Sequence, residues 1–112
     1  MSKRIEIVKK FLTAFSEENR NEFVEDTLSS DFTFSAPSDP LLNREEFFEK
    51  CWPYGHNLTE IKYVRIIENG DEIIITHEFT KPDGSRAQNT DVFIFSGDQI
   101  SRFEVYFGWD IK

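Results

Sequence analysis

The first part of the chain carries its apolar residues at helical spacing. They recur every three or four positions, at Ile5, Val8, Phe11, Leu12 and Phe15. This spacing predicts an amphipathic helix over residues 3–16, with one face turned towards a core.

A second, shorter helix is predicted over residues 19–30. Asn19 is the expected N-cap, and Glu22, three positions further on, has the spacing of its reciprocal capping partner. The segment "DFTFSA" then alternates between polar and apolar residues, which predicts a short strand over residues 31–36.

The next segment is predicted to form a loop followed by a third helix. Pro37 and Pro40 bracket the loop, and Asn43 and Glu46 repeat the capping pattern at the start of a helix over residues 43–52. The Trp-Pro-Tyr-Gly sequence that follows ends this helical pattern.

From Leu58 onward the hydrophobic period changes to that of strands. Asn69-Gly70, Pro82-Asp83-Gly84 and Gly97-Asp98 are turn sequences that divide this part of the chain. We predict four antiparallel strands, over residues 58–68, 71–80, 86–95 and 99–109.

Three helices followed by a four-strand meander predict an α+β fold. The helices are expected to pack on one face of a curved, mostly antiparallel sheet. The length of 112 residues fits a single domain over residues 1–112, and 12 phenylalanines predict an aromatic core.

Charge and composition narrow the function classes. The net charge is −8 and the longest basic run is Lys9-Lys10, so binding to nucleic acid or to an anionic membrane is not expected. No apolar run is long enough for a transmembrane helix or a signal peptide, so a cytoplasmic location is expected. Cys51 is the only cysteine, and two scattered histidines do not form a metal motif, so neither a disulfide, a metal nor a cofactor is predicted.

His77 and Asp91 flank the Pro-Asp-Gly turn. A three-residue loop pairs His77 with Asn89 and Ile75 with Asp91. Because side chains alternate along a strand, His77 and Asp91 then share a face as diagonal neighbours, with backbones about 7–8 Å apart.

The aromatic alternation predicts which face is interior. Phe79, Phe93 and Phe95 share the face of His77 and Asp91, whereas the opposite face carries threonines, Val92 and Ile94. The last strand repeats this division, with Phe103, Val105, Phe107 and Trp109 on one side. A two-residue turn at Gly97-Asp98 would instead bring Glu104 beside Asp91; we follow the hydrophobic alternation.

A carboxylate and an imidazole in an aromatic wall have two interpretations. Burial raises the pKa of a carboxyl group unless a partner compensates, so His77 and Asp91 are candidates for a general acid–base pair. The same pair could instead be a satisfied structural contact or a non-catalytic specificity contact.

The order of elements, with "FLTAF", "SEENRNEF", "LLNREEFFE", "NTDVFIFSGDQI" and the final "ISRFEVYFGW", resembles the nuclear transport factor 2 superfamily, in particular its SnoaL-like branch. The resemblance covers the whole chain and implies a cystatin-like cone, in which a strongly curved sheet encloses an internal pocket. The superfamily includes polyketide cyclases, steroid delta-isomerases, dehydratases and non-catalytic binders, commonly as dimers.

The resemblance also bears on single residues. Asp91 resembles the pocket acid of the isomerases and cyclases, and His77 the histidine that accompanies it in the cyclases. The isomerases need a further acidic base where this chain has Ala36-Pro37, and a tyrosine where it has Phe11. Steroid isomerisation by that mechanism is therefore not expected, whereas cyclase-like aldol or proton-transfer chemistry stays open.

We therefore expect a small, largely apolar ligand in the pocket, with no cofactor, and a homodimer through the outer sheet face that carries Val92, Ile94 and Tyr106. A non-catalytic ligand binder or a protein-interaction module of the same fold is the alternative. Besides Asp91 and His77, the predicted pocket-lining residues are Phe11, Phe15, Trp52, Tyr54, Ile75, Phe79, Asn89, Phe93, Phe103, Val105, Phe107 and Trp109.

Overall fold

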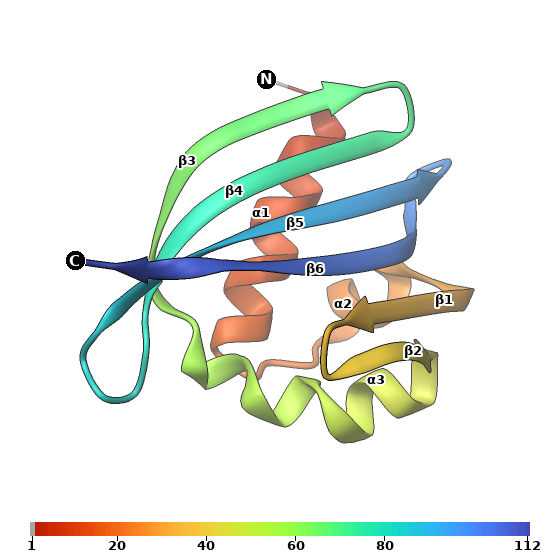
Figure 1. Cartoon of the computed structure of the whole chain (residues 1–112). Coiled ribbons are helices and arrows are strands. Elements are labelled where there is room, and N and C mark those ends of the chain that lie inside the picture. Colours follow the sequence, from red (N-terminus) through yellow and green to blue (C-terminus); the bar gives the residue numbers. More distant parts are fainter. Residues whose placement is uncertain (1) are drawn as a thin grey trace.

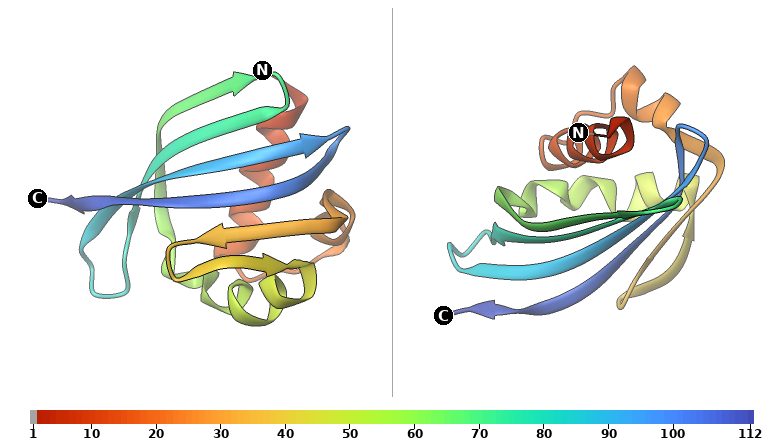
Figure 2. Two further views of the ribbon diagram at one scale, coloured as in Figure 1. Left: turned by 45° about the vertical axis from the view of Figure 1, so that its right-hand side comes forward. Right: turned by 90° about the horizontal axis from the view of Figure 1, so that it is seen from above.

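Six strands form one curled sheet, and the helices cover its concave face (Figures 1 and 2). The computed structural model describes residues 2–112. The helices are α1 (Lys3–Ser16), α2 (Glu22–Thr27), α3 (Arg44–Lys50) and the 3₁₀-helix η1 (Trp52–Asn57). The strands are β1 (Leu28–Ala36), β2 (Asp39–Asn43), β3 (Thr59–Asn69), β4 (Glu72–Thr80), β5 (Arg86–Ser96) and β6 (Gln99–Ile111).

The sheet has the strand order β2-β1-β6-β5-β4-β3. Only β1 and β6 are parallel neighbours; the other pairs are antiparallel. This confirms the predicted α+β class, the four-strand meander and the helical cover of one sheet face.

The predicted second helix was wrong in its bounds and in its cap. Asn21, not Asn19, is the N-cap, and its side chain accepts a hydrogen bond from the Val24 N–H. Asn19 instead helps to end α1, because its N–H donates to the Ala14 carbonyl while Glu18 adopts a left-handed φ of 54°. Two possible caps within three residues gave the sequence pattern no means of choosing between them.

The predicted loop between Pro37 and Pro40 is in fact a hairpin. β2 pairs with β1 so that Leu42 lies opposite Phe34, and it forms one edge of the sheet. An edge strand needs ladder hydrogen bonds on one side only, so it can accommodate Pro40 without an N–H group.

The start of α3 confirms the predicted capping box. The Asn43 side chain accepts from the Glu46 N–H at 2.9 Å, and the Glu46 side chain accepts from the Asn43 N–H at 3.0 Å. The helix ends at Lys50, earlier than predicted, and Pro53 near the start of η1 marks the change to 3₁₀ geometry.

The core between helices and sheet consists largely of aromatic rings, most of which meet edge-to-face or tilted. Phe11 and Phe47 are fully buried, and Phe93 stacks on Phe103 with ring centroids 4.4 Å apart. Trp52 packs on Phe15 at 5.2 Å. Deleting such a ring removes its burial and leaves a cavity, which costs about 3–5 kcal/mol.

Arg4 of α1 contacts two turns at one end of the sheet. Its guanidinium donates to the Gly97 carbonyl at 2.8 Å, forms an ion pair with Asp71 at 3.0 Å, and lies over the Phe95 ring. One side chain thus ties α1 to the β3–β4 turn and the β5–β6 turn.

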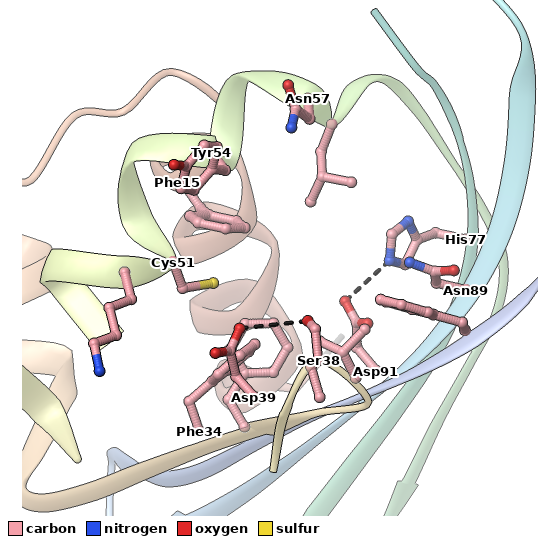
Figure 3. Close-up of a pocket in the computed structure, with 16 residues that line it drawn as sticks. Phe15, Phe34, Ser38, Asp39, Cys51, Tyr54, Asn57, His77, Asn89 and Asp91 are labelled. Atoms are coloured by element: carbon pink, nitrogen blue, oxygen red, sulfur yellow. Dashed lines mark hydrogen bonds and ion pairs between the residues drawn. The ribbon is translucent and has the colours of Figure 1, made fainter. Parts of the chain in front are cut away.

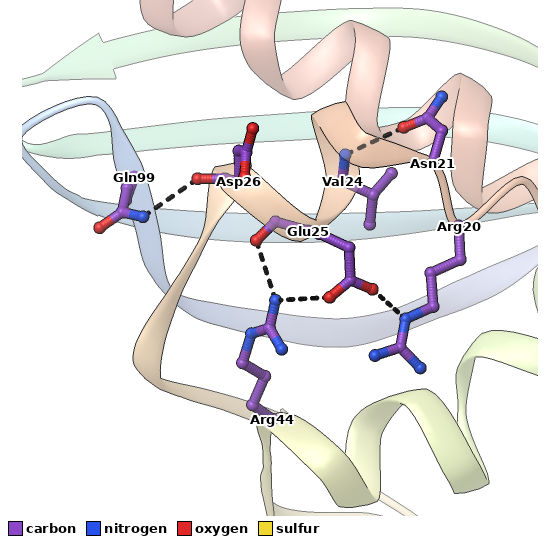
Figure 4. Close-up of polar contacts among 7 residues, drawn as sticks. All are labelled: Arg20, Asn21, Val24, Glu25, Asp26, Arg44 and Gln99. Carbon is purple, nitrogen blue, oxygen red and sulfur yellow. Dashed lines mark hydrogen bonds and ion pairs between the residues drawn. The ribbon is translucent and has the colours of Figure 1, made fainter.

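A second polar cluster joins α2 to α3 (Figure 4). Glu25 accepts hydrogen bonds from Arg20 and Arg44, and these bonds, the Arg20 bond foremost, hold its pKa below the usual range. Both guanidiniums also lie over the Phe48 ring, at 3.6 Å for Arg20 and 5.3 Å for Arg44. Each ion pair is partly exposed and contributes little by itself. The packing of both guanidiniums on Phe48 therefore provides most of the stabilisation between α2 and α3.

Candidate functional site

The turn between β4 and β5 places His77 and Asp91 on one face of the sheet. The Lys81 N–H donates to the Ser85 carbonyl at 2.8 Å, closing a three-residue loop in which Gly84 adopts φ +87°. His77 therefore pairs with Asn89, and Asp91 with Ile75. The predicted register is confirmed.

The register of β6 depends on a bulge at Ser101. Phe95 pairs with Ile100 but Ile94 pairs with Arg102, so one residue of β6 is left without a partner on β5. The Ser101 hydroxyl donates to the Ile94 carbonyl at 3.1 Å. The extra residue turns Val105, rather than Glu104, towards the Asp91 side, as the hydrophobic alternation predicted.

Asp91 and His77 form a buried polar pair in this wall. The His77 Nε2 lies 2.9 Å from the Asp91 Oδ2, and the two residues are 1% and 2% exposed. Among the residues that the structure describes, neither His77 Nδ1 nor Asp91 Oδ1 has a hydrogen-bond partner. Both atoms are therefore available to bind a ligand. A ligand that satisfied them would offset the cost of leaving buried polar groups without partners.

Burial changes the acidity of Asp91. Loss of solvation raises the pKa of Asp91 above its ordinary value, while the hydrogen bond and charge of His77 act in the opposite direction. A carboxylate whose pKa is raised is a stronger base than that of an exposed aspartate, as general base catalysis requires.

The pair borders a cavity of about 390 Å³ between the sheet and the helices (Figure 3). This volume is within the range of small-molecule sites. The sheet wall consists of His77, Asn89, Asp91, Phe103, Val105 and Phe107. The helical wall consists of Phe15, Lys50, Cys51, Tyr54, Asn57 and Leu58, and the β1–β2 hairpin adds Phe34, Ala36, Ser38 and Asp39.

The predicted pocket residues fall into three groups. Those that line the cavity, besides Asp91 and His77, are Phe15, Tyr54, Asn89, Phe103, Val105 and Phe107. Those that lie in the packed core behind it are Phe11, Trp52, Ile75 and Phe93. Phe79 and Trp109 do not line this cavity: Phe79 is buried outside the main aromatic cluster and Trp109 is exposed. Both border a separate hollow, which Asn89 and Phe107 share.

Sequence reasoning missed the part of the cavity that comes from the β1–β2 hairpin and the end of α3. The sequence predicts a loop at Ser38 and Asp39, whereas the β1–β2 hairpin brings the Asp39 carboxylate to the cavity. The alternation of Phe34 and Ala36 along β1 was the signal that could have pointed to this wall.

Cys51 directs its sulfur into the cavity, opposite the Asp91 wall (Figure 3). Burial, with smaller contributions from the charges of Asp39 and Asp91, raises the pKa of this thiol to about 12. Cys51 therefore stays a neutral thiol and is a poor nucleophile.

Asn89 is oriented by a second bulge in β6. The Gly108 N–H donates to the Asn89 Oδ1 at 3.3 Å, and a side chain at Gly108 would place its Cβ 2.2 Å from the Gln88 carbonyl oxygen. Because this bond occupies the amide oxygen, the Asn89 NH₂ group remains free to donate on the His77 side of the cavity (Figure 3).

Over residues 2–112, no group of three or more His, Cys, Asp or Glu side chains is arranged to hold a metal ion. Within the same range, no helix combines the length and apolar character required to span a bilayer. His56 lies away from the cavity, exposed and 3.2 Å from Glu18.

Comparison with known proteins places the fold. An NTF2-like protein of unknown function from Burkholderia pseudomallei superposes with a TM-score of 0.75 at 19% identity, over 96% of this chain and 92% of that one. The chain has the NTF2-like fold. No family model and no curated protein sequence matches it.

Two other structures with this fold contain small organic molecules. TerC, co-crystallised with polyporic acid, gives a TM-score of 0.71 at 17% identity, over 96% of this chain and 92% of TerC. A hypothetical protein with a ketosteroid isomerase-like fold from Catenulispora acidiphila, in complex with trimethylamine, gives a TM-score of 0.71 at 15% identity, over 92% of this chain and 85% of that one. At these identities the likeness of this chain to NTF2-like proteins is one of fold alone.

Proposed function

We propose that this NTF2-like protein binds a small, largely apolar carbonyl compound in its cavity and moves a proton on it, as in cyclase-like aldol chemistry. One observation carries the proposal. A buried carboxyl–imidazole pair, with unused hydrogen-bonding positions on both partners, borders an otherwise mainly apolar cavity.

The proposed step is proton abstraction next to the carbonyl. The Asp91 carboxylate takes a proton from the adjacent carbon, so that the C–H bond breaks and an enolate forms. His77, donating from Nε2, orients the carboxylate, and the Asn89 NH₂ group donates to the enolate oxygen. Return of a proton from Asp91 to carbon, or to a different atom, completes the reaction.

The solved structures that contain small molecules support the ligand-binding part of the proposal. TerC with polyporic acid and the Catenulispora protein with trimethylamine both share the fold of this chain. The catalytic part depends on Asp91, whose pKa burial raises.

A non-catalytic carrier of the same ligand is the second candidate. The cavity supports it because aromatic side chains such as Phe15, Phe34 and Phe103 contribute much of its wall, and these bind without chemistry. The two candidates differ in what Asp91→Asn should do: an enzyme loses turnover and retains affinity, whereas a carrier has no turnover to lose.

Hydrogen–deuterium exchange on a ketone tests the enzyme and the carrier candidates without knowledge of the natural substrate. The ketone 2-tetralone is small, apolar and acidic next to its carbonyl, and NMR in D₂O reports the exchange of those protons. We expect the protein to accelerate this exchange, and Asp91→Asn to reduce the acceleration by about 10²–10⁴-fold, the usual contribution of a general acid–base group.

Asp26→Asn is the matched control, because it makes the same change at an exposed carboxylate on α2, away from the cavity. It should exchange 2-tetralone at the wild-type rate. Saturable binding without exchange would leave the carrier function, and absence of binding in a panel of aryl ketones would reject both candidates.

A further inference from the structure

The concave face of the sheet continues past the helices that roof the cavity. The β4–β5 hairpin and the end of β6 extend beyond the helical layer in both views of Figure 2. A hollow of about 350 Å³ lies on this uncovered part. Its principal side chains are Phe79, Lys81, Ala87, Phe107, Trp109 and Asp110.

The hollow and the cavity share a wall. Asn89 and Phe107, which are paired across β5 and β6, border both spaces. On β4, the Phe79 ring lies 5.7 Å from the His77 imidazole, one alternation further along the same face. The inward face of the sheet therefore forms one continuous strip from the Asp91–His77 pair to the hollow.

Two aromatic rings stand exposed at this hollow. Phe107 is 60% and Trp109 is 69% exposed. Neighbouring exposed aromatic rings of this size commonly mark a binding surface. The Lys81–Asp110 ion pair, at 2.9 Å, forms a polar border beside them.

We propose that the hollow is a second subsite for the ligand of the cavity, and that it binds an aromatic ring attached to the carbonyl-bearing part. This inference rests on the proposed function, because the cavity must hold the first part of the ligand. The continuity of the two spaces along one concave strip carries it. The ring stacks against Trp109 and Phe107, while the carbonyl group reaches Asn89 and the pair.

The test compares two ketones that differ by one ring. The short probe is 2-tetralone, and the extended probe is 6-phenyl-2-tetralone, which carries the ring at the end remote from the carbonyl. Trp52→Phe leaves Trp109 as the one tryptophan, so that its fluorescence reports on the hollow. We expect the extended probe alone to quench this emission and to bind about tenfold more tightly than the short probe, the gain typical of burying one apolar ring.

Variants separate the subsite from other effects. Trp109→Ala should remove most of the tenfold difference without changing the affinity for 2-tetralone, and Trp109→Phe should restore it. Tyr106→Ala is the matched control, an exposed aromatic residue next to Phe107 that borders neither space. It should leave both affinities unchanged.

The outcomes distinguish this proposal from the proposed function. If neither ketone binds, the cavity function fails. If both bind equally well and Trp109 emission does not respond, the cavity function stands and the subsite is rejected. If Trp109→Ala changes only the oligomeric state, the hollow is a contact between copies of the chain and the subsite is equally rejected.

Discussion

The Nε2 of His77 lies 2.9 Å from the Oδ2 of Asp91, although the two residues are on different strands and fourteen positions apart in the chain. A three-residue turn and the alternation of strand side chains suffice to bring them together. Their burial then gives this contact its chemical character, because a shielded carboxyl group favours its neutral form.

Asp91→Asn should stabilise the protein at neutral pH. Burial raises the pKa of Asp91, so the fold prefers the protonated group. This preference acts fully below the ordinary aspartate pKa of about 3.9 and is lost as the pH rises through the raised value in the folded state. The variant should therefore be more stable than the wild type at pH 8, by the roughly 0.5–2 kcal/mol that stabilising substitutions usually give, and nearly equal to it at pH 4.

Thermal unfolding across this pH range measures the effect. A gain of about 1 kcal/mol corresponds to a rise in Tm of about 4–8 °C for a domain of this size. Asp26→Asn should show no such trend. A variant that is less stable than the wild type by a constant amount at every pH would mean that Asp91 is a structural hydrogen-bond partner and not a carboxyl group whose pKa is raised by burial.

His77→Leu should shift the pH dependence of 2-tetralone exchange to higher pH. The hydrogen bond and charge of His77 lower the pKa of Asp91, so their removal raises this pKa further, and the carboxylate proposed as the base forms only at higher pH. The rate at pH 9 should be affected less than the rate at pH 6. An unshifted profile with a uniformly lower rate would assign His77 a role in packing alone.

Cys51 should react very slowly with thiol reagents in the folded protein. Its pKa of about 12 leaves few thiolates at pH 8. Relative to a free cysteine of pKa about 8.5, labelling should be slower by about a thousandfold. Labelling by a disulfide reagent, with and without denaturant, measures this ratio. Similar rates in the two conditions would show that the thiol does not lie in an apolar cavity.

Gly55→Ala should displace the helical wall of the cavity. A Cβ at this position would lie 1.9 Å from the Phe15 carbonyl oxygen, so η1 must move away from α1. Overpacking of this kind costs about 1–3 kcal/mol. Denaturant unfolding gives the loss, and 2-tetralone affinity should fall with it because Tyr54 and Asn57 move. Gly70→Ala has no close contact but is strained by its left-handed φ of +60°, so it should cost stability without changing the affinity for 2-tetralone.

The parts of the fold that followed from the sequence were those with one dominant periodic signal. The meander, the register of His77 against Asn89 and the capping box at Asn43 each combined a pattern with a matching turn or cap. The inward position of Asp91 followed in the same way from the alternation of aromatic residues around it.

The remaining features depend on contacts between distant segments. The bulge at Gly108 shows in no periodicity, yet it places Asp110, and not Trp109, opposite Ala87. Phe11 and Trp52 are aromatic residues of the kind found both in pocket walls and in cores. Their packing on other rings, which the sequence does not show, places them in the core.

We also propose that the outer face of the sheet binds a second copy of the chain. This face carries the half-buried Val92 and Ile94, together with a Thr76–Thr90 hydrogen bond at 2.9 Å. Light scattering should give twice the chain mass of 13.2 kDa, and Val92→Glu should reduce it to the single mass. A wild-type monomer at micromolar concentration would reject this interface.

The state of Asp91 itself tests the central claim most directly. Carbon-13 NMR of the labelled side-chain carboxyl group follows its titration, with Asp91→Asn to assign the resonance. We expect an apparent pKa above the ordinary value of about 3.9, and a change in the resonance when 2-tetralone binds. Titration at or below the ordinary value, with no response to the ketone, would contradict both the enclosed pair and its place in the ligand site.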